Sequence, residues 1–336
     1  MDSPISIPDR SPGWRRSLGA CLGALGLGAL LLFALMALVD PYDSGRFGWL
    51  GIAGVDDKNP LTANASRARD PQFDSAIFGN STGQLLNPTE LSQATGKRFV
   101  QLVAPGADPR GHLAILDFFQ RNHPRIGALV FAVDDPWCSH TLPNLPANSF
   151  PFWLYRGSMF GYVGQMFTWS AIDRVFRRLT IGFGSRKPTY PDGFWSYEEV
   201  WPPGQKHPAV VSQPSAPAFA GAVSDVFPFK AMLDQALRKL PADVPVVLIV
   251  PPVFHTVIPK PGTEAAAERQ ACNAAYRSIV AGRPNSNFID YRIDNELTRD
   301  PANFADFIHY RTKIASKLDG GIAASIRFGE AAKIDF

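Results

Sequence analysis

Phe-Asp-Ser-Ala-Ile-Phe-Gly-Asn-Ser-Thr, residues 73–82, is the stretch that decides the fold predicted for this chain. Its residues 76–78 form a short apolar run, as expected for a strand that a parallel sheet buries on both faces. Gly79 and Asn80 end the run, because both residue types tolerate the backbone angles of a tight turn. Ser81 therefore stands where the strand meets the turn, at the edge where open α/β sheets bind their ligands.

Two interpretations of Ser81 follow from this stretch alone. The serine is either a nucleophile presented at the carboxyl end of the strand or a strand-end residue that caps the next helix. The stretch by itself favours the helix cap. The nucleophile becomes the better interpretation only if the rest of the chain supplies a base and a group that orients it.

Four more segments have the same apolar character, and helical patterns separate them. They lie at residues 98–103, 126–133, 244–250 and 287–290. Strands that alternate with helices predict a doubly wound α/β fold with a five-stranded, flavodoxin-like parallel sheet, in which the first strand lies centrally. The predicted domain covers residues 73–328 and is interrupted by an aromatic-rich insert at residues 140–221.

The composition is that of a globular protein and argues against one class of partner. The 336 residues are 46% hydrophobic and 19% charged, which separates the chain from disordered proteins. The formal net charge is only +3, so the charge balance gives no reason to expect nucleic acid as a partner.

The N-terminal region predicts a membrane anchor. Residues 17–39 are uncharged and strongly apolar, and a helix of this length spans ~34 Å, enough to cross a bilayer. Arginines precede the run and acidic residues follow it. The positive-inside rule therefore places residues 1–16 in the cytoplasm and the main domain in the periplasm or outside the cell. A cleaved signal peptide is the alternative, but its apolar region usually has only ~7–15 residues.

The segment after this helix, residues 40–72, is rich in Asp, Gly, Pro and Asn and has no sustained hydrophobic period. This composition predicts a tether between the membrane helix and the domain. Part of the segment is expected to wrap irregularly over the domain surface.

Two cysteines, Cys138 and Cys272, fall in the predicted outer compartment, where disulfides persist. A bridge between them requires their Cα atoms to lie within about 7 Å, and the sequence does not give this distance. A Cys138–Cys272 disulfide and two buried free thiols therefore remain as alternatives.

The insert at residues 140–221 interrupts the alternation of strands and helices with many Pro, Phe, Trp and Tyr residues. Its segment 158–179 predicts a helix with a broad apolar face and arginines near its end. The favoured interpretation is a lid or wall over the carboxyl edge of the sheet. Contact of the aromatic residues and arginines with a membrane surface is the second interpretation, and a packed excursion is the third.

A base for Ser81 is predicted near the end of the chain. Asp306 and His309 are three residues apart in a loop that enters the last helix, so the loop should reach the same edge of the sheet as Ser81. This spacing lets the carboxylate hold Nδ1–H while Nε2 faces the nucleophile. The alternative is a helix-capping aspartate and an exposed histidine, but the two together with the strand pattern favour a catalytic pair.

These motifs resemble those of the SGNH/GDSL hydrolase superfamily. Its first block carries the nucleophile in Gly-Asp-Ser, to which Gly-Asn-Ser at 79–81 is similar, and its last block carries Asp-x-x-His, which matches residues 306–309. The resemblance covers about residues 73–139 and 222–328. It leaves out the membrane helix and the insert.

The resemblance implies a role for each matching residue. Ser81 would be the nucleophile, His309 the base and Asp306 its orienting partner. The backbone N–H groups of Ser81 and of Gly106, at the end of the second strand, would contribute to the oxyanion hole. No cofactor and no metal ion is implied, and with no histidine near Asp134 in the sequence a metal role for that aspartate is not expected.

The chain departs from the superfamily pattern in two places. Asn80 replaces the usual aspartate before the nucleophile. The third block's Gly-x-Asn is absent, and the matching strand end carries Asp134 and Asp135 instead. An aspartate donates to an oxyanion only when protonated, and the loss of one donor typically costs ~10²–10³ in rate. Hydrolases, transfer enzymes and inactive descendants therefore all remain as interpretations.

Four residues are predicted to line a substrate site at this edge, namely Asn80, Asp134, Asp135 and His255. The alternative for the two aspartates is a turn cap. Membrane-anchored relatives of the superfamily that act outside the cytoplasm include proteins that add or remove acyl groups on envelope polysaccharides.

The resulting expectation is a membrane-anchored esterase or O-acyltransferase whose partner is an acyl ester or a glycan. A glycan-binding or assembly component of an envelope complex, without chemistry of its own, is the alternative. Hydrolysis of lipid esters at the membrane surface is a further one.

Overall fold

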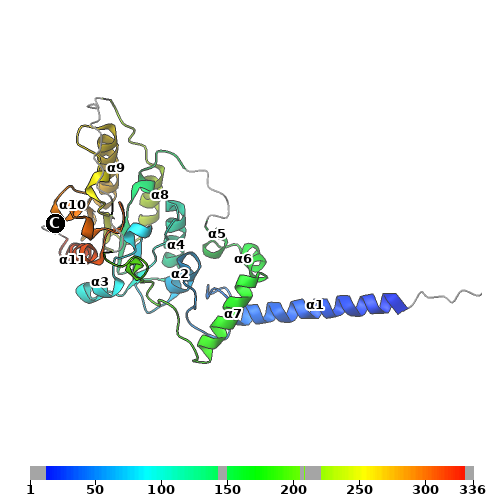
Figure 1. Ribbon diagram of the computed structural model, residues 1–336. Coiled ribbons are helices and arrows are strands. Elements are labelled where there is room, and N and C mark those ends of the chain that lie inside the picture. The colour runs from blue at the N-terminus through cyan, green and yellow to red at the C-terminus, as the bar shows by residue number, and fades with distance from the viewer. Residues whose placement is uncertain (1–12, 143–149, 205–207, 209–220, 330–336) are drawn as a thin grey trace, which may run out of the picture.

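A computed structural model describes residues 13–142, 150–204, 208 and 221–329, and its centre is one parallel sheet (Figure 1). The strands are β1 (Ser75–Phe78), β2 (Phe99–Gln101), β3 (Ala128–Ala132), β4 (Val246–Val250) and β5 (Asn287–Asp290). They are all parallel and lie in the order β2-β1-β3-β4-β5, which is the flavodoxin-like order. The predicted α/β class and the interior position of β1 are confirmed.

Helices cover both faces of the sheet because successive residues of each buried strand point to opposite sides. In β1, Ala76 and Phe78 join one apolar cluster, whereas Ile77 joins the other. The first cluster includes side chains of α4 (Pro109–Asn122), α8 (Pro228–Leu237) and α9 (Glu264–Val280). The second includes side chains of α3 (Pro88–Thr95) and α11 (Thr312–Phe328).

The helices after β1 and β2 begin with the caps that the sequence indicates. The side chain of Asn87 accepts hydrogen bonds from the backbone N–H groups of Thr89 and Glu90, and Pro88 occupies the first helical position of α3. Asp108 caps α4 in the same way, followed by Pro109. These caps fix the point at which each connection turns away from the carboxyl edge of the sheet.

The remaining elements are short or lie outside the sheet layers. They are α1 (Gly13–Val39), α2 (Pro60–Arg69), α5 (Phe152–Tyr155), α6 (Met159–Met166), α7 (Trp169–Gly182) and α10 (Glu296–Arg299), with 3-10 helices η1 (Ser81–Gly83), η2 (Asp135–Cys138), η3 (Tyr197–Glu199), η4 (His255–Val257) and η5 (Pro301–Asn303).

Helix α1 has 27 residues and is long and apolar enough to cross a membrane. Figure 1 shows it projecting away from the domain as a single rod. Only its C-terminal end is buried in the domain, through Met36, Ala37 and Val39. The rest of its side chains are largely exposed, as expected for a helix whose apolar surface is not covered by the domain itself.

Residues 40–72, for which a tether and an irregular wrap over the domain were predicted, pack against the domain, and part of the wrap is the regular helix α2. Asn59 caps α2, and this helix packs on α4. Its polar residues Asn64 and Arg67 are buried: Asn64 donates to the carbonyl of Val103, and Arg67 donates to the carbonyls of residues 189 and 190. Burial of polar side chains through distant partners explains why no hydrophobic period marked this segment.

The described part of the insert divides into two portions. Helices α5, α6 and α7 lie on the side of the domain from which α1 leaves, and α7 contacts α1 (Figure 1). Residues 190–201 instead run along the edge of β2, where the backbone N–H of Gln101 donates to the carbonyl of Asp192. They then continue toward the end of the connection between β5 and α11. The predicted wall at the carboxyl edge therefore applies only to this second portion.

Cys138 and Cys272 form a disulfide, so of the two alternatives the bridge is the correct one. Their Cα atoms are 5.6 Å apart, and the bond joins η2, directly after β3, to α9. Cys21 is free and exposed on α1.

Candidate active site

Ser81 lies directly beyond the carboxyl end of β1, because the chain turns sharply at Gly79. Gly79 has a φ of +156°, and a Cβ atom added there would lie 2.7 Å from the Cβ of Ala132 on the adjacent strand. Only glycine permits this close approach. Ser81 then begins η1 and is half-buried, so its hydroxyl remains within reach of solvent.

The structure brings Ser81, His309 and Asp306 together in one hydrogen-bonded chain. Nε2 of His309 lies 2.9 Å from Oγ of Ser81, and Nδ1 of His309 lies 2.7 Å from Oδ2 of Asp306. An ionised Asp306 accepts the Nδ1 proton, which leaves Nε2 as the acceptor for the serine hydroxyl. This is the arrangement that activates a serine nucleophile.

The loop that carries the pair is held by its own backbone. Oδ1 of Asp306 accepts the N–H groups of Ile308 and His309 at 2.9 Å each, and the N–H of Ala305 donates to the carbonyl of His309 at 2.7 Å. Partial burial opposes ionisation of Asp306, but the hydrogen bonds from His309 and Ile308 outweigh it and lower its pKa to about 2. The carboxylate is thus charged at neutral pH and orients the imidazole.

Two aromatic rings from the insert wall the base. The ring of Tyr197 lies 5.5 Å from that of His309, and the ring of Trp201 lies 5.7 Å from it. The hydroxyl of Tyr197 donates to the carbonyl of Tyr310, which fixes this wall to the catalytic loop. Sequence reasoning missed both residues, since their only signal was the general aromatic content of the insert.

The two predicted oxyanion donors point at one position, and an oxygen atom of Asn80 occupies it. The backbone N–H groups of Ser81 and Gly106 donate to the same atom, Oδ1 of Asn80, at 2.9 and 2.6 Å. Because both partners are donors, the atom that they hold must be the carboxamide oxygen. Asn80, predicted to line the substrate site, therefore bonds to both backbone groups that were predicted to form the oxyanion hole.

Asp134 follows β3, the strand beside β1, and contacts Thr82, the residue after Ser81. Phe78 of β1 is paired with Phe131 of β3, and both Ser81 and Asp134 follow three residues later. Asp134 is buried. Its Oδ2 accepts a hydrogen bond of 3.4 Å from the hydroxyl of Thr82, whereas Oδ1 is buried without a hydrogen-bond partner.

Burial raises the pKa of Asp134 to about 7, with a contribution from the neighbouring Asp135 and with opposition from Arg292. A large fraction of this carboxyl is therefore protonated near neutral pH, and the protonated form has a hydrogen to donate.

Asp135 has a different role from Asp134. Its Oδ1 accepts hydrogen bonds of 2.6 Å from both Arg269 on α9 and Arg292 after β5. These two guanidinium groups outweigh its partial desolvation and lower its pKa. The side chain joins three segments at the edge of the sheet, so it acts in the structure as an ion-pair centre.

His255 begins η4 after β4. Its ring packs on Phe254 at 4.7 Å, and the backbone N–H of Phe254 donates to the carbonyl of Phe307 in the catalytic loop. His255 thus stands beside the loop. Within the described residues, no three His, Cys, Asp or Glu side chains come together as metal ligands would.

Comparison with family models, with curated proteins and with solved structures found no match to this chain.

Proposed function

We propose that the protein is a serine acyl hydrolase or O-acyltransferase that forms an acyl-enzyme on Ser81. The observation that carries the proposal is the hydrogen-bonded chain from Ser81 through His309 to Asp306 at the carboxyl edge of an interior strand. Such an edge is where this class of sheet binds ligands.

The residues present support each step of acyl transfer. Oγ of Ser81 attacks the acyl carbonyl as Nε2 of His309 takes the hydroxyl proton, and Asp306 stabilises the imidazolium that results. The imidazolium then gives its proton to the departing alcohol. Water or an acceptor hydroxyl attacks the acyl-enzyme with His309 again as base, and Ser81 is released.

The oxyanion of each tetrahedral intermediate would lie where the Ser81 and Gly106 N–H groups meet. The oxygen of Asn80 must leave this point before the oxyanion can form there, so Asn80 acts as a placeholder in the resting site. We assign a third donor to protonated Asp134, supported by its contact with Thr82, the residue after Ser81, and by its unpartnered Oδ1. It would replace the side-chain amide donor that the third block of the SGNH/GDSL superfamily supplies and this chain lacks.

The location and substrate class follow from the helix and the resemblance. Helix α1 would anchor the protein with its N-terminus in the cytoplasm and the domain in the periplasm or outside the cell. The disulfide supports this side, since such bonds persist in oxidising compartments. The proposed substrate is an acyl ester, with a glycan of the cell envelope as the acyl donor or acceptor, and partners in an envelope complex would accompany this role.

A second candidate is a glycan-binding or assembly component that has lost its chemistry. The observation that favours it is the Asn80 oxygen on both backbone donors. If this oxygen never leaves, the triad has no place to stabilise an oxyanion.

Labelling with a fluorophosphonate separates the two candidates, since the reagent bonds only to an activated serine. The full chain is reconstituted in lipid nanodiscs, and Ser81→Ala is compared with Ser139→Ala, a second serine at the same edge of the sheet. The enzyme predicts labelling of the wild type and of Ser139→Ala, and none of Ser81→Ala. Absence of Ser81-dependent labelling in the folded protein would favour the second candidate.

A further inference from the structure

Helix α7 carries an aromatic stripe that the domain does not cover. Trp169, Phe176 and the capping residue Phe183 are 87%, 58% and 80% exposed. Residues seven apart return to nearly the same side of an α-helix, so these three rings form one line. Another side of α7 is buried through Val175 and Arg178. A soluble domain rarely leaves such a line of large apolar groups without a partner.

Other large apolar side chains are exposed on α6, which contacts α7, and on the segment that follows α1. Phe160 on α6 is 93% exposed, and Trp49 is 78% exposed. The backbone next to Trp49 is bonded to α1 itself, because Gly48 and Leu50 donate to the carbonyls of Ala37 and Leu38. Trp49 therefore lies beside the place where α1 enters the domain.

One ring contact shows where this surface lies along the axis of α1. Phe167, between α6 and α7, stacks on Phe33 of α1 with 6.3 Å between ring centroids. Phe33 lies six residues before the end of the helix at Val39, or ~9 Å along its axis. The α6–α7 junction thus lies beside a part of α1 that belongs to its apolar run.

This depth matters because the free part of α1 is short. Residues 17–33 span ~25 Å, whereas the hydrocarbon core of a bilayer is ~30 Å thick. If α1 crosses the membrane, the bilayer surface must therefore reach the level of Phe33 and of the α6–α7 junction.

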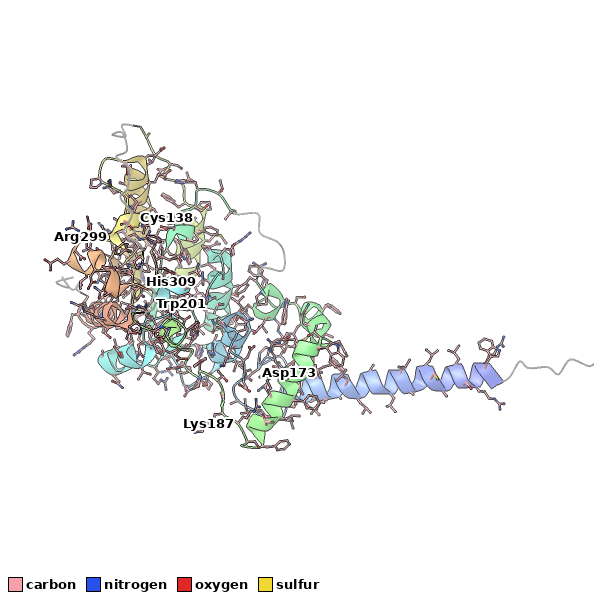
Figure 2. The ribbon with its side chains drawn as sticks, in the orientation of Figure 1. Cys138, Asp173, Lys187, Trp201, Arg299 and His309 are labelled. Atoms are coloured by element: carbon pink, nitrogen blue, oxygen red, sulfur yellow. A yellow bond between two sulfur atoms is a disulfide. The ribbon has the colours of Figure 1, made fainter. Side chains whose placement is uncertain are left out.

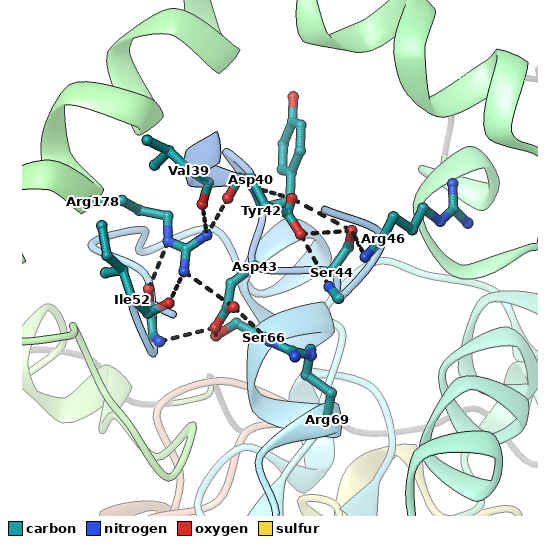
Figure 3. A network of polar contacts seen from close by, with 12 residues as sticks. Val39, Asp40, Tyr42, Asp43, Ser44, Arg46, Ile52, Ser66, Arg69 and Arg178 are labelled. Atoms are coloured by element: carbon teal, nitrogen blue, oxygen red, sulfur yellow. Dashed lines mark hydrogen bonds and ion pairs between the residues drawn. The ribbon is translucent and has the colours of Figure 1, made fainter. Parts of the chain in front are cut away.

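The position of α7 on α1 is fixed by the side chain of Arg178, which is 1% exposed (Figure 3). Its guanidinium donates to the carbonyls of Val39 and Asp40, at the C-terminal end of α1, and also to those of Ile52 and Gly54. It also forms an ion pair with Asp43 at 3.1 Å. These bonds prevent α7 from rotating, so its aromatic stripe keeps one orientation relative to α1.

We propose that α6 and α7 form a second membrane contact, in which the stripe of Trp169, Phe176 and Phe183 lies in the lipid interface beside the point where α1 leaves the bilayer. The occupant of the exposed face is the lipid bilayer. Aromatic side chains favour this interface, where the rings enter the acyl boundary and charged neighbours remain at the headgroups.

The domain is then held at the membrane at two adjoining places, and His309 and Trp201 lie in the body of the domain, apart from α1 (Figure 2). The inference depends on α1 crossing the membrane and is independent of the chemistry at Ser81.

Site-directed spin labelling of the full chain tests the contact. In a Cys21→Ser background with the disulfide intact, Phe176→Cys is compared with Arg177→Cys, its neighbour about 100° around the same helix. Each protein is reconstituted as one copy per nanodisc. The collision rates of the label with oxygen, which enters lipid, and with a nickel chelate, which stays in water, are measured.

The proposal predicts an oxygen-to-nickel ratio about tenfold higher at position 176 than at position 177, as expected across a lipid interface. Phe183→Cys should follow position 176, and Leu25→Cys in α1 should give the highest ratio. Equal ratios at 176 and 177, or a water-like ratio at 25, would overturn the proposal. Protection of 176 from both reagents would overturn it too, by showing that protein covers the stripe.

Fluorophosphonate labelling of the same proteins keeps this result separate from the proposed function. Position 176 is far from Ser81, so labelling at Ser81 should be the same with and without the spin label. A lipid-like ratio at position 176 in a protein whose Ser81 does not react with the fluorophosphonate would uphold the membrane contact and reject the enzyme.

Discussion

The proposed catalytic edge, which is the carboxyl edge of the sheet around Ser81, and the junction of α7 with α1 are both completed by the insert. They use polar groups in opposite ways. At the junction, the guanidinium of Arg178 holds four carbonyls and a carboxylate and is almost fully buried. At the catalytic edge, Ser81 is half-buried, one oxygen of Asp134 has no hydrogen-bond partner, and Asn80 holds donors that an oxyanion would need.

This difference indicates that the junction is built to be rigid. The groups at the catalytic edge are instead arranged so that they can exchange hydrogen-bond partners. Unsatisfied buried groups weaken a fold, so they persist where they serve a reaction. Substitutions at the catalytic edge should therefore change rates more than stability. Substitutions at the junction should change stability more than the reactivity of each folded molecule.

The largest effect is expected for Ser81→Ala and His309→Ala. Each should lower the rate of acyl-ester hydrolysis by about 10⁴–10⁶, because the members of a triad act as a unit. The midpoint of thermal unfolding should change little, since both side chains are only partly buried. Rates on an activated ester and thermal scans of the same samples provide the check. A large loss of stability in either variant would break the contrast between the regions.

The next largest effect is expected at the junction, for Arg178→Met. The change removes one of the two arginines paired with buried Asp43 and takes the guanidinium donors away from four carbonyls, so the free energy of unfolding should fall by about 3–5 kcal/mol. Denaturant titration in detergent measures it, with the exposed Arg177→Met as the matched control. Fluorophosphonate labelling per folded molecule should stay at the wild-type level, and a proportional loss of labelling would contradict the separation.

The third prediction sharpens the catalytic edge through pH. Asp134 donates only while protonated, so its contribution to the acylation rate is present below its pKa of about 7 and is lost as the pH rises. Asp134→Asn keeps a donor at every pH and should exceed the wild type by about 10² at pH 9, the typical worth of one oxyanion donor. The surrounding charged and titratable groups, Asp135, Arg292 and Tyr276, are unchanged in the variant.

Rate–pH profiles of both proteins between pH 5 and pH 9 test this prediction, with Asp134→Leu as the variant that has no donor. The leucine variant should be slow throughout. Parallel profiles for the wild type and Asp134→Asn would remove Asp134 from the oxyanion site.

The smallest effect is expected at Asp319, a buried carboxyl between α11 and α3 that belongs to neither region. Burial raises its pKa to about 8, against hydrogen bonds from the N–H of Asn87. The folded state therefore binds more protons than the unfolded state between about pH 4 and pH 8. This group lowers the free energy of unfolding by about 1.4 kcal/mol per unit as the pH rises through that window.

Asp319→Asn keeps an acceptor for the N–H of Asn87 and removes the titrating carboxyl. The free energy of unfolding of this variant should therefore fall less steeply between pH 6 and pH 7 than that of the wild type. Urea unfolding at both pH values provides the measurement. An unchanged slope would mean that Asp319 is ionised in the folded protein.

The sheet and the triad could be predicted because their signals are local. Each strand is a short apolar run, and Asp306 and His309 are only three residues apart, so the rule that parallel strands end at one edge was enough to place them near Ser81. The packing of residues 40–72 gave no such signal. Buried Arg67 has partners more than 120 residues away, and periodicity carries no information on contacts of this range.

The contact of Asn80 was missed for a different reason. The sequence showed that an unusual residue precedes the nucleophile, but the direction of its side chain depends on the backbone angles at Gly79 and on where Gly106 lies. The disulfide was left open on similar grounds, because a distance of 5.6 Å between Cα atoms arises from the placement of α9 against η2.

The disulfide also imposes an order of events on a newly made chain. Cys138 emerges 134 residues before Cys272, so it must wait as a thiol while the insert and β4 are synthesised. When the bond closes, it ties α9, with Arg269, to the segment that holds Asp135. The bond can close only after β4 and much of α9 have been made, before or after β5, Arg292 and the Asp306–His309 loop are added. A molecule stalled before this step is a thiol-bearing intermediate that oxidoreductases can recognise and hold.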